Sequence, residues 1–160
     1  MEVKNPTKFA AFFSGINKRI SMDKFEDKLE VQKIIYIGQE NGIDLGYNFE
    51  WDLRGPYCQQ VSGDAHEVLD SKIKSTLSEA GLDEHRVSEL GKILQPYIND
   101  SEWLEIAGSL LYLRKEYYPE RKIEEIIGYL LEDLTYGYKN FSESLVRRIL
   151  VEMMRIGLIK

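Results

Sequence analysis

Apolar side chains recur at a helical period over most of the 160 residues of this chain. One helix face is marked near the start by i, i+3, i+4, i+7 spacing, in Phe9, Phe12, Phe13 and Ile16. Stripes with the same period predict helices at 25–40, 84–98, 101–116, 123–134 and 143–156. The helix at 25–40 carries apolar residues on two sides, which places it at the centre of the core. Asp23 and Glu26 are its predicted capping pair.

The helical period is interrupted once, where Phe49, Trp51 and Leu53 alternate with polar residues. Alternation at period two predicts a half-buried strand. We expect Gly55-Pro56 to end this strand and Pro56 to open a short helix, because proline suits the first helical position. Ser62-Gly63 is expected to break that helix, and 71–77 is either a second strand or a loop.

These patterns predict a mainly α fold. It is a helical bundle with a small β element near residues 47–54 and a C-terminal helical hairpin, for which a helix-turn-helix is the alternative form. The length fits a single domain, 1–160, with a seam near 77–83 between a mixed α/β half and an all-helical half.

The net charge of −6 is concentrated in the middle of the chain. Residues 42–120 hold 7 basic and 15 acidic side chains, whereas the segments on either side are each +1. This distribution argues against a uniformly basic surface for nucleic acid and favours a basic partner. A single cysteine, no apolar signal region and no membrane-length apolar run lead us to expect a cytoplasmic protein that does not enter membranes.

The sequence gives little support for catalysis. Cys58 is predicted near the start of a helix, where a thiol pKa can fall, and His66 is its nearest candidate base. A helix broken at Gly63 does not require these two side chains to face each other. No metal-ligand spacing and no glycine-rich phosphate loop is present in the sequence. We therefore expect a protein without enzymatic activity, cofactor or metal, and keep an enzyme using Cys58 as the least favoured alternative.

The most distinctive local segment runs from Trp51 to Tyr57. Arg54, Gly55 and the first N–H groups of the helix expected to follow could bind an anion or a partner carboxylate. The alternative is a scaffold role, in which Trp51 and Tyr57 are core aromatics around a corner.

A second basic group lies in the C-terminal helix pair and comprises Lys139, Arg147, Arg148 and Arg155. Exposed arginines here could contact DNA phosphates, so a DNA-binding transcriptional regulator is the alternative function. A hairpin that closes the bundle is favoured over it, because the connection at 135–140 is longer than a helix-turn-helix turn.

Three motifs resemble the YwgA family of uncharacterised prokaryotic proteins: a Gln32-to-Tyr36 helix, a Gly42-to-Tyr47 link and a Phe49-to-Tyr57 corner. The same helix and corner are distantly similar to the SocA-like, or Panacea, domain of antitoxins and of a proteolytic adaptor. That resemblance implies a regulatory module that binds another protein, with a basic toxin-like protein as the narrower hypothesis. With Arg54 added, the implied partner-binding residues are Gln32, Lys33, Tyr36, Trp51, Arg54, Gly55, Pro56 and Tyr57.

Overall fold

The computed structural model describes residues 3–117, 119–135 and 141–159, and these form a mainly helical protein with one small sheet. The helices of the N-terminal part are α1 (Asn5–Gly15), α2 (Phe25–Glu40), α3 (Gln59–Asp70), α4 (Leu77–Ala80) and α5 (Glu84–Leu94). They are followed by α6 (Ser101–Tyr112), the π-helical turn η1 (Leu113–Tyr117), α7 (Ile123–Thr135) and α8 (Glu143–Arg155). The predicted mainly α fold is confirmed.

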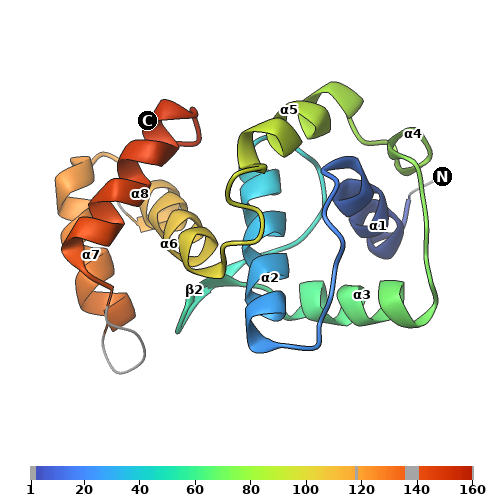
Figure 1. The fold of residues 1–160 in the computed structure, drawn as a ribbon, viewed down its shortest axis with the longest axis horizontal. Helices are drawn as coiled ribbons and strands as arrows, with labels where there is room; N and C mark the ends of the chain where they lie inside the picture. Colours follow the sequence, from blue (N-terminus) through green and yellow to red (C-terminus); the bar gives the residue numbers. More distant parts are fainter. Residues whose placement is uncertain (1–2, 118, 136–140, 160) are drawn as a thin grey trace.

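Helix α2 is the centre of the molecule, as its two apolar sides predict. Its residues from Leu29 to Gly38 are all buried. Helices α3 and α6 both pack on it, α1, α4 and α5 lie beyond it on one side, and α7 and α8 pack on α6 on the other (Figure 1). One hydrophobic cluster runs through all of these layers, and α4 within the 77–83 segment packs against α1.

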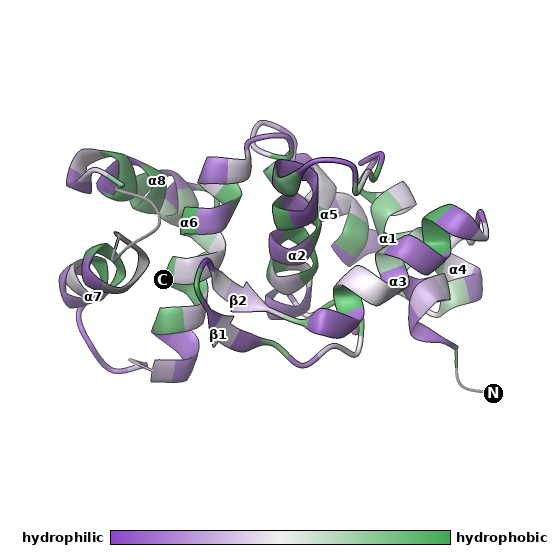
Figure 2. Ribbon diagram, turned by 90° about the horizontal axis from the view of Figure 1, so that it is seen from below, coloured by the Kyte–Doolittle hydropathy of each residue, from purple (hydrophilic) through white to green (hydrophobic). Residues whose placement is uncertain are grey.

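The period-two segment forms a hairpin rather than a single strand. Strand β1 (Glu50–Asp52) pairs antiparallel with β2 (Gly55–Tyr57), and Trp51 lies opposite Pro56. The expectation that Pro56 starts a helix is therefore wrong. Both strands of a two-stranded sheet are edges, where proline is accepted, and Gly55 takes the left-handed φ of +94° that follows the turn. The hairpin lies between α6 and α2 (Figure 2).

Two local predictions need correction, and the structure decides between two alternatives for a third segment. Helix α3 begins after Cys58 and continues through Ser62-Gly63 to Asp70, because a glycine inside a helix costs only about 1 kcal/mol against alanine. For the segment 71–77 the loop alternative is correct at residues 71–76, and Leu77 begins α4. At the start of α2, Asp27 rather than Glu26 caps the helix by accepting a hydrogen bond of 3.0 Å from the Lys24 N–H.

The C-terminal helices follow their sequence signals closely. The Ser142 hydroxyl accepts a hydrogen bond of 3.1 Å from the Leu145 N–H, which caps α8 as its position predicts. Gly157 ends the helix with a φ of +81°, and Leu158 and Ile159 are buried against the bundle. Among the described residues, every helix is too short or too polar to cross a membrane.

Candidate functional site

Two glutamine side chains of α2 hold the hairpin segment at its two ends. The Gln32 amide accepts a hydrogen bond of 2.9 Å from the Cys58 N–H and donates bonds of 2.8 Å to the Cys58 carbonyl and 3.0 Å to the Ser62 hydroxyl. Two helical turns later, Gln39 accepts a bond of 2.7 Å from the Tyr47 N–H and donates one of 2.9 Å to its carbonyl. The spacing of seven residues puts both amides on one helix face. Helix α2 therefore fixes where the hairpin lies.

Replacing the Gln32 amide is expected to loosen this attachment. Gln32→Leu keeps the side-chain bulk but leaves the buried Cys58 N–H without its acceptor and the Cys58 carbonyl with only the Val61 N–H as a donor, so we expect a loss of about 2 kcal/mol in the free energy of unfolding. Urea denaturation measures it. The exposed Gln60 provides the matched control, and its Gln60→Leu variant is expected to stay within about 0.5 kcal/mol of wild type. Equal effects of the two variants would contradict the assignment.

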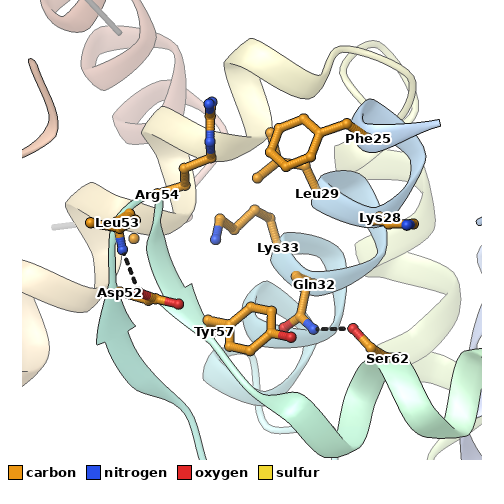
Figure 3. Close-up of a pocket in the computed structure, with 11 residues that line it drawn as sticks. Phe25, Lys28, Leu29, Gln32, Lys33, Asp52, Leu53, Arg54, Tyr57 and Ser62 are labelled. Carbon is orange, nitrogen blue, oxygen red and sulfur yellow. Dashed lines mark hydrogen bonds between the residues drawn. The ribbon is translucent and has the colours of Figure 1, made fainter. Parts of the chain in front are cut away.

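A cavity of about 310 Å³ opens between α2 and the hairpin. Its walls are largely apolar, formed by Phe25 and Leu29 of α2, Leu53 of the turn and Tyr57 of β2 (Figure 3). Phe25, Leu53 and Tyr57 are 52%, 57% and 38% exposed. Three of the seven large hydrophobic side chains that are exposed in the described part of the chain thus line this one pocket.

Lys33 lies at the floor of the pocket and is almost completely buried, with 1% of its surface exposed. Its ammonium points into the space between Arg54, Asp52 and Tyr57 (Figure 3) and donates a hydrogen bond of 2.6 Å to the Pro56 carbonyl. A Cβ added to Gly108 of α6 would come within 3.3 Å of the Lys33 side chain, so this glycine leaves room for the lysine. The lysine therefore connects α2, β2 and α6.

Burial lowers the pKa of Lys33 to about 7, because the charged ammonium loses its hydration. The carboxylates of Glu105 and Asp52 oppose this shift and the Arg54 cation adds to it. The surroundings of Lys33 therefore compensate its positive charge only in part.

Arg54 occupies the turn of the hairpin beside this lysine. Its guanidinium lies 4.5 Å from the centroid of the Phe25 ring, and its Nη1 is 3.7 Å from the Glu105 carboxylate. The Arg54 side chain is 28% exposed, whereas that of Glu105 is 1% exposed. The distance to Glu105 is that of an ion pair rather than of a hydrogen bond, so this carboxylate does not engage the guanidinium closely.

The structure brings five of the eight predicted partner-binding residues to one pocket, namely Gln32, Lys33, Arg54, Gly55 and Tyr57. Tyr36 and Trp51 instead join an aromatic group elsewhere, where each contacts Tyr112. Pro56 contributes its carbonyl to Lys33. Sequence reasoning missed Phe25, Leu29 and Leu53 as pocket residues and Glu105 as a buried charge. An acidic residue inside the apolar run from Trp103 to Leu111 is the signal that could have indicated Glu105.

The residues of the enzyme alternative are not brought together in an accessible place. Cys58 is 8% exposed, and its backbone groups are held by Gln32. His66 lies on α3 and is exposed. Within the described ranges, no three His, Cys, Asp or Glu side chains lie close enough together to hold a metal ion.

The basic residues of the DNA-binding alternative are already partly compensated. Arg147 contacts Glu124 at 2.6 Å and Glu143 at 3.3 Å, and Arg148 lies 4.0 Å from Glu152. Arg155 is exposed at the end of α8, and Lys139 lies outside the described residues. The carboxylates compete with phosphate for Arg147, so these contacts do not favour a DNA surface on α8.

Comparison of the chain with protein-family models, with curated proteins and with solved structures finds no match. The resemblance to the YwgA family and to the SocA-like domain therefore stays a prediction from sequence motifs.

Proposed function

We propose that this chain is a non-enzymatic regulatory module that binds a partner protein, and that the pocket between α2 and the hairpin is its docking site. The observation that carries the proposal is the gathering of exposed Phe25, Leu53 and Tyr57 around a pocket with charged side chains at its floor and rim. Exposed apolar side chains clustered beside a few placed polar groups are typical of a binding surface.

The charge distribution supports a partner that is mainly basic. The segment from residue 42 to 120 carries the −8 balance of the chain and includes the hairpin. Charge complementarity speeds association and disfavours acidic competitors. A basic toxin-like protein fits this description, and an antitoxin-like role is the narrower form of the proposal.

Photo-crosslinking from the pocket rim tests the docking site. A photoreactive amino acid replaces Leu53 in one variant and Val151 of α8 in the other, since these residues are 57% and 60% exposed. We expect one discrete protein adduct from position 53 and none from position 151. The adduct partner is then purified and titrated against the intact chain. Adducts of equal yield from both positions, or a purified partner that fails to bind, would contradict the proposal.

Charge introduced at the rim is expected to weaken the complex without unfolding the protein. Leu53→Asp adds a desolvation cost at an apolar contact, so we expect the Kd for the purified partner to rise at least about tenfold. Val151→Asp is the matched control and is expected to leave the Kd unchanged within about twofold. Isothermal titration calorimetry measures both. For the antitoxin-like role, the partner expressed alone is expected to arrest growth, and co-expression with this chain to restore it.

A further inference from the structure

Two cations from different elements line the pocket. Lys33 comes from α2 and Arg54 from the turn between β1 and β2, and both line the cavity (Figure 3). Lys28 adds a third, exposed cation at the edge. Among the described residues, Asp52 is the one acidic side chain that lines the pocket, and Glu105 lies behind Arg54. The charged side chains of the lining are therefore mainly cationic, with Arg54 contributed by the acidic segment 42–120 and the two lysines by the segment before it.

The hydrogen-bonding capacity of the Lys33 ammonium is only partly used. An ammonium carries three N–H donors, and the described part of the chain gives this one a single acceptor, the Pro56 carbonyl. A buried cation with unused donors is costly, and a carboxylate placed against it supplies both the acceptors and the opposite charge. The Arg54 guanidinium lines the same pocket and can add charge-assisted hydrogen bonds to a carboxylate, since its contact with Glu105 is long.

The apolar walls of the pocket indicate which kind of chemical group would bring that carboxylate. Phe25, Leu29 and Leu53 are apolar and flank the entrance to the cations, so a group that brings a negative charge must also bring apolar surface on its sides. The cavity of about 310 Å³ suits a small number of side chains rather than a folded surface.

From this arrangement we infer that the pocket takes an acidic side chain flanked by apolar side chains, on a segment of the partner protein, with Lys33 and Arg54 receiving the carboxylate. The inference rests on the proposed function and specifies the chemistry of the partner at this site. A partner of mainly basic surface then carries one acidic anchor residue.

Blocked peptides test the anchor chemistry. The probes are acetyl-Phe-Glu-Leu-amide and its neutral counterpart acetyl-Phe-Gln-Leu-amide, titrated into the full chain and followed by NMR shifts of backbone amides, in a buffer without carboxylates. We expect the glutamate peptide to bind about tenfold or more tightly than the glutamine peptide, because it adds charge-assisted hydrogen bonds. Equal binding of the two peptides would overturn the inference.

Variants assign the recognition to Lys33 and Arg54. Lys33→Met keeps a linear side chain beside Gly108, and Arg54→Gln keeps a polar side chain in the turn. Each is expected to remove most of the preference for the glutamate peptide. Lys92→Met removes an exposed charge from α5, outside the pocket, and is the matched control, with less than about twofold change expected. Preference that survives in both Lys33→Met and Arg54→Gln would overturn the assignment.

The pH dependence of binding gives a readout that does not depend on a variant folding. The groups that face the Lys33 ammonium are Asp52 of β1, Arg54 of the turn and Glu105 of α6, and Lys28 and Tyr57 line the same pocket. With the pKa of Lys33 at about 7, the ammonium form falls from about nine-tenths to about one-tenth between pH 6 and 8, while the peptide carboxylate stays ionised. Affinity for the glutamate peptide is therefore expected to fall about tenfold over this range, and an affinity that rises with pH would overturn the inference.

The outcomes separate this inference from the proposed function. A specific partner adduct at position 53 supports the docking site. If the glutamate and glutamine peptides then bind equally, the acidic anchor is contradicted and the docking site is not. A further titration uses 4-phenylbutyrate, which offers the same carboxylate and apolar group without a peptide. Binding of both this acid and the glutamate peptide supports the inference. If 4-phenylbutyrate binds and the glutamate peptide does not, the pocket binds a free organic acid, and the inference that it takes a segment of a partner protein is overturned.

Discussion

Gly55→Ala is expected to lower the free energy of unfolding by about 4 kcal/mol. Gly55 has a φ of +94°, a conformation that costs a residue with a Cβ about 1–3 kcal/mol. An added Cβ would also clash with the Ser109 hydroxyl oxygen of α6, and such overpacking costs about 1–3 kcal/mol more. Urea denaturation at neutral pH measures the loss, and circular dichroism checks that the helices remain.

Ser109→Ala separates the two causes of that loss. Among the described residues, the buried Ser109 hydroxyl has no hydrogen-bond partner, so Ser109→Ala alone is expected to be neutral or slightly stabilising. Combined with Gly55→Ala it is expected to recover only part of the lost stability, because the backbone strain at Gly55 remains. Full recovery would show that the strain at positive φ is negligible.

Gly63 is the matched glycine control. It lies inside α3 at an ordinary helical φ, and a Cβ there meets no atom of the described chain within 4 Å. Gly63→Ala is therefore expected to stabilise the protein by about 0.5–1 kcal/mol, because alanine favours the helix. A loss of stability at both glycines would point to a general intolerance of substitution rather than to the geometry of Gly55.

Most helices could be predicted because a stripe of apolar residues marks each of them in the sequence, whereas α4 and the start of α3 were not predicted. The two apolar sides of α2 predict its central place, and Ser142 and Gly157 mark the ends of α8. A local pattern suffices for such elements, since a helix makes its backbone hydrogen bonds within itself. The register of a hairpin depends on contacts from outside its own strands.

The hairpin could not be predicted from its own residues. Gly55-Pro56 is equally good as a helix start and as the entry to an edge strand. Contacts with α2 and α6 determine that a strand forms here. Gln32 and Gln39 of α2 hold the two ends of the hairpin segment, and Ser109 of α6 leaves room for no residue larger than glycine at position 55. These contacts join residues that are far apart in the sequence, so no window of neighbouring residues contains them.

Part of the pocket could be predicted from sequence motifs, and part depends on contacts between distant segments. Gln32, Lys33 and Tyr57 belong to the motifs that resemble known families, and five of the eight predicted residues do line one cavity. Glu105 lies 51 positions beyond Arg54 and comes beside it only because α6 packs against β2. The apolar walls were missed because an exposed Phe25 or Leu53 has the same pattern in the sequence as a core residue.

Lys33 makes the stability of this protein depend on pH in a direction that is unusual for a lysine. We expect the free energy of unfolding to rise by about 2–3 kcal/mol between pH 7 and 9, and Lys33→Met to lack this rise. The pKa of Lys33 is lowered from 10.5 to about 7 by burial. Between these values the unfolded chain holds a proton that the folded protein has lost, so stability increases with pH, by up to about 1.4 kcal/mol per unit.

Urea denaturation of wild type, Lys33→Met and Lys28→Met at pH 6, 7, 8 and 9 measures this slope. Lys28 is exposed, so its variant is expected to keep the wild-type slope and thereby to account for the other groups that titrate in the range. Identical slopes in wild type and Lys33→Met would show that Lys33 keeps an ordinary pKa in the folded protein.

The same titration bears on the acidic anchor. A carboxylate held against Lys33 raises the pKa of that lysine, so the glutamate peptide is expected to stabilise wild type most at pH 6–7, where the free protein holds the ammonium without enough compensating charge. With saturating peptide, the free energy of unfolding of wild type is expected to lose its rise between pH 7 and 9. The pH dependence of Lys33→Met is expected to stay unchanged. A slope that persists at saturating peptide would mean that the carboxylate binds elsewhere, because an anion in contact with the ammonium must change its proton affinity.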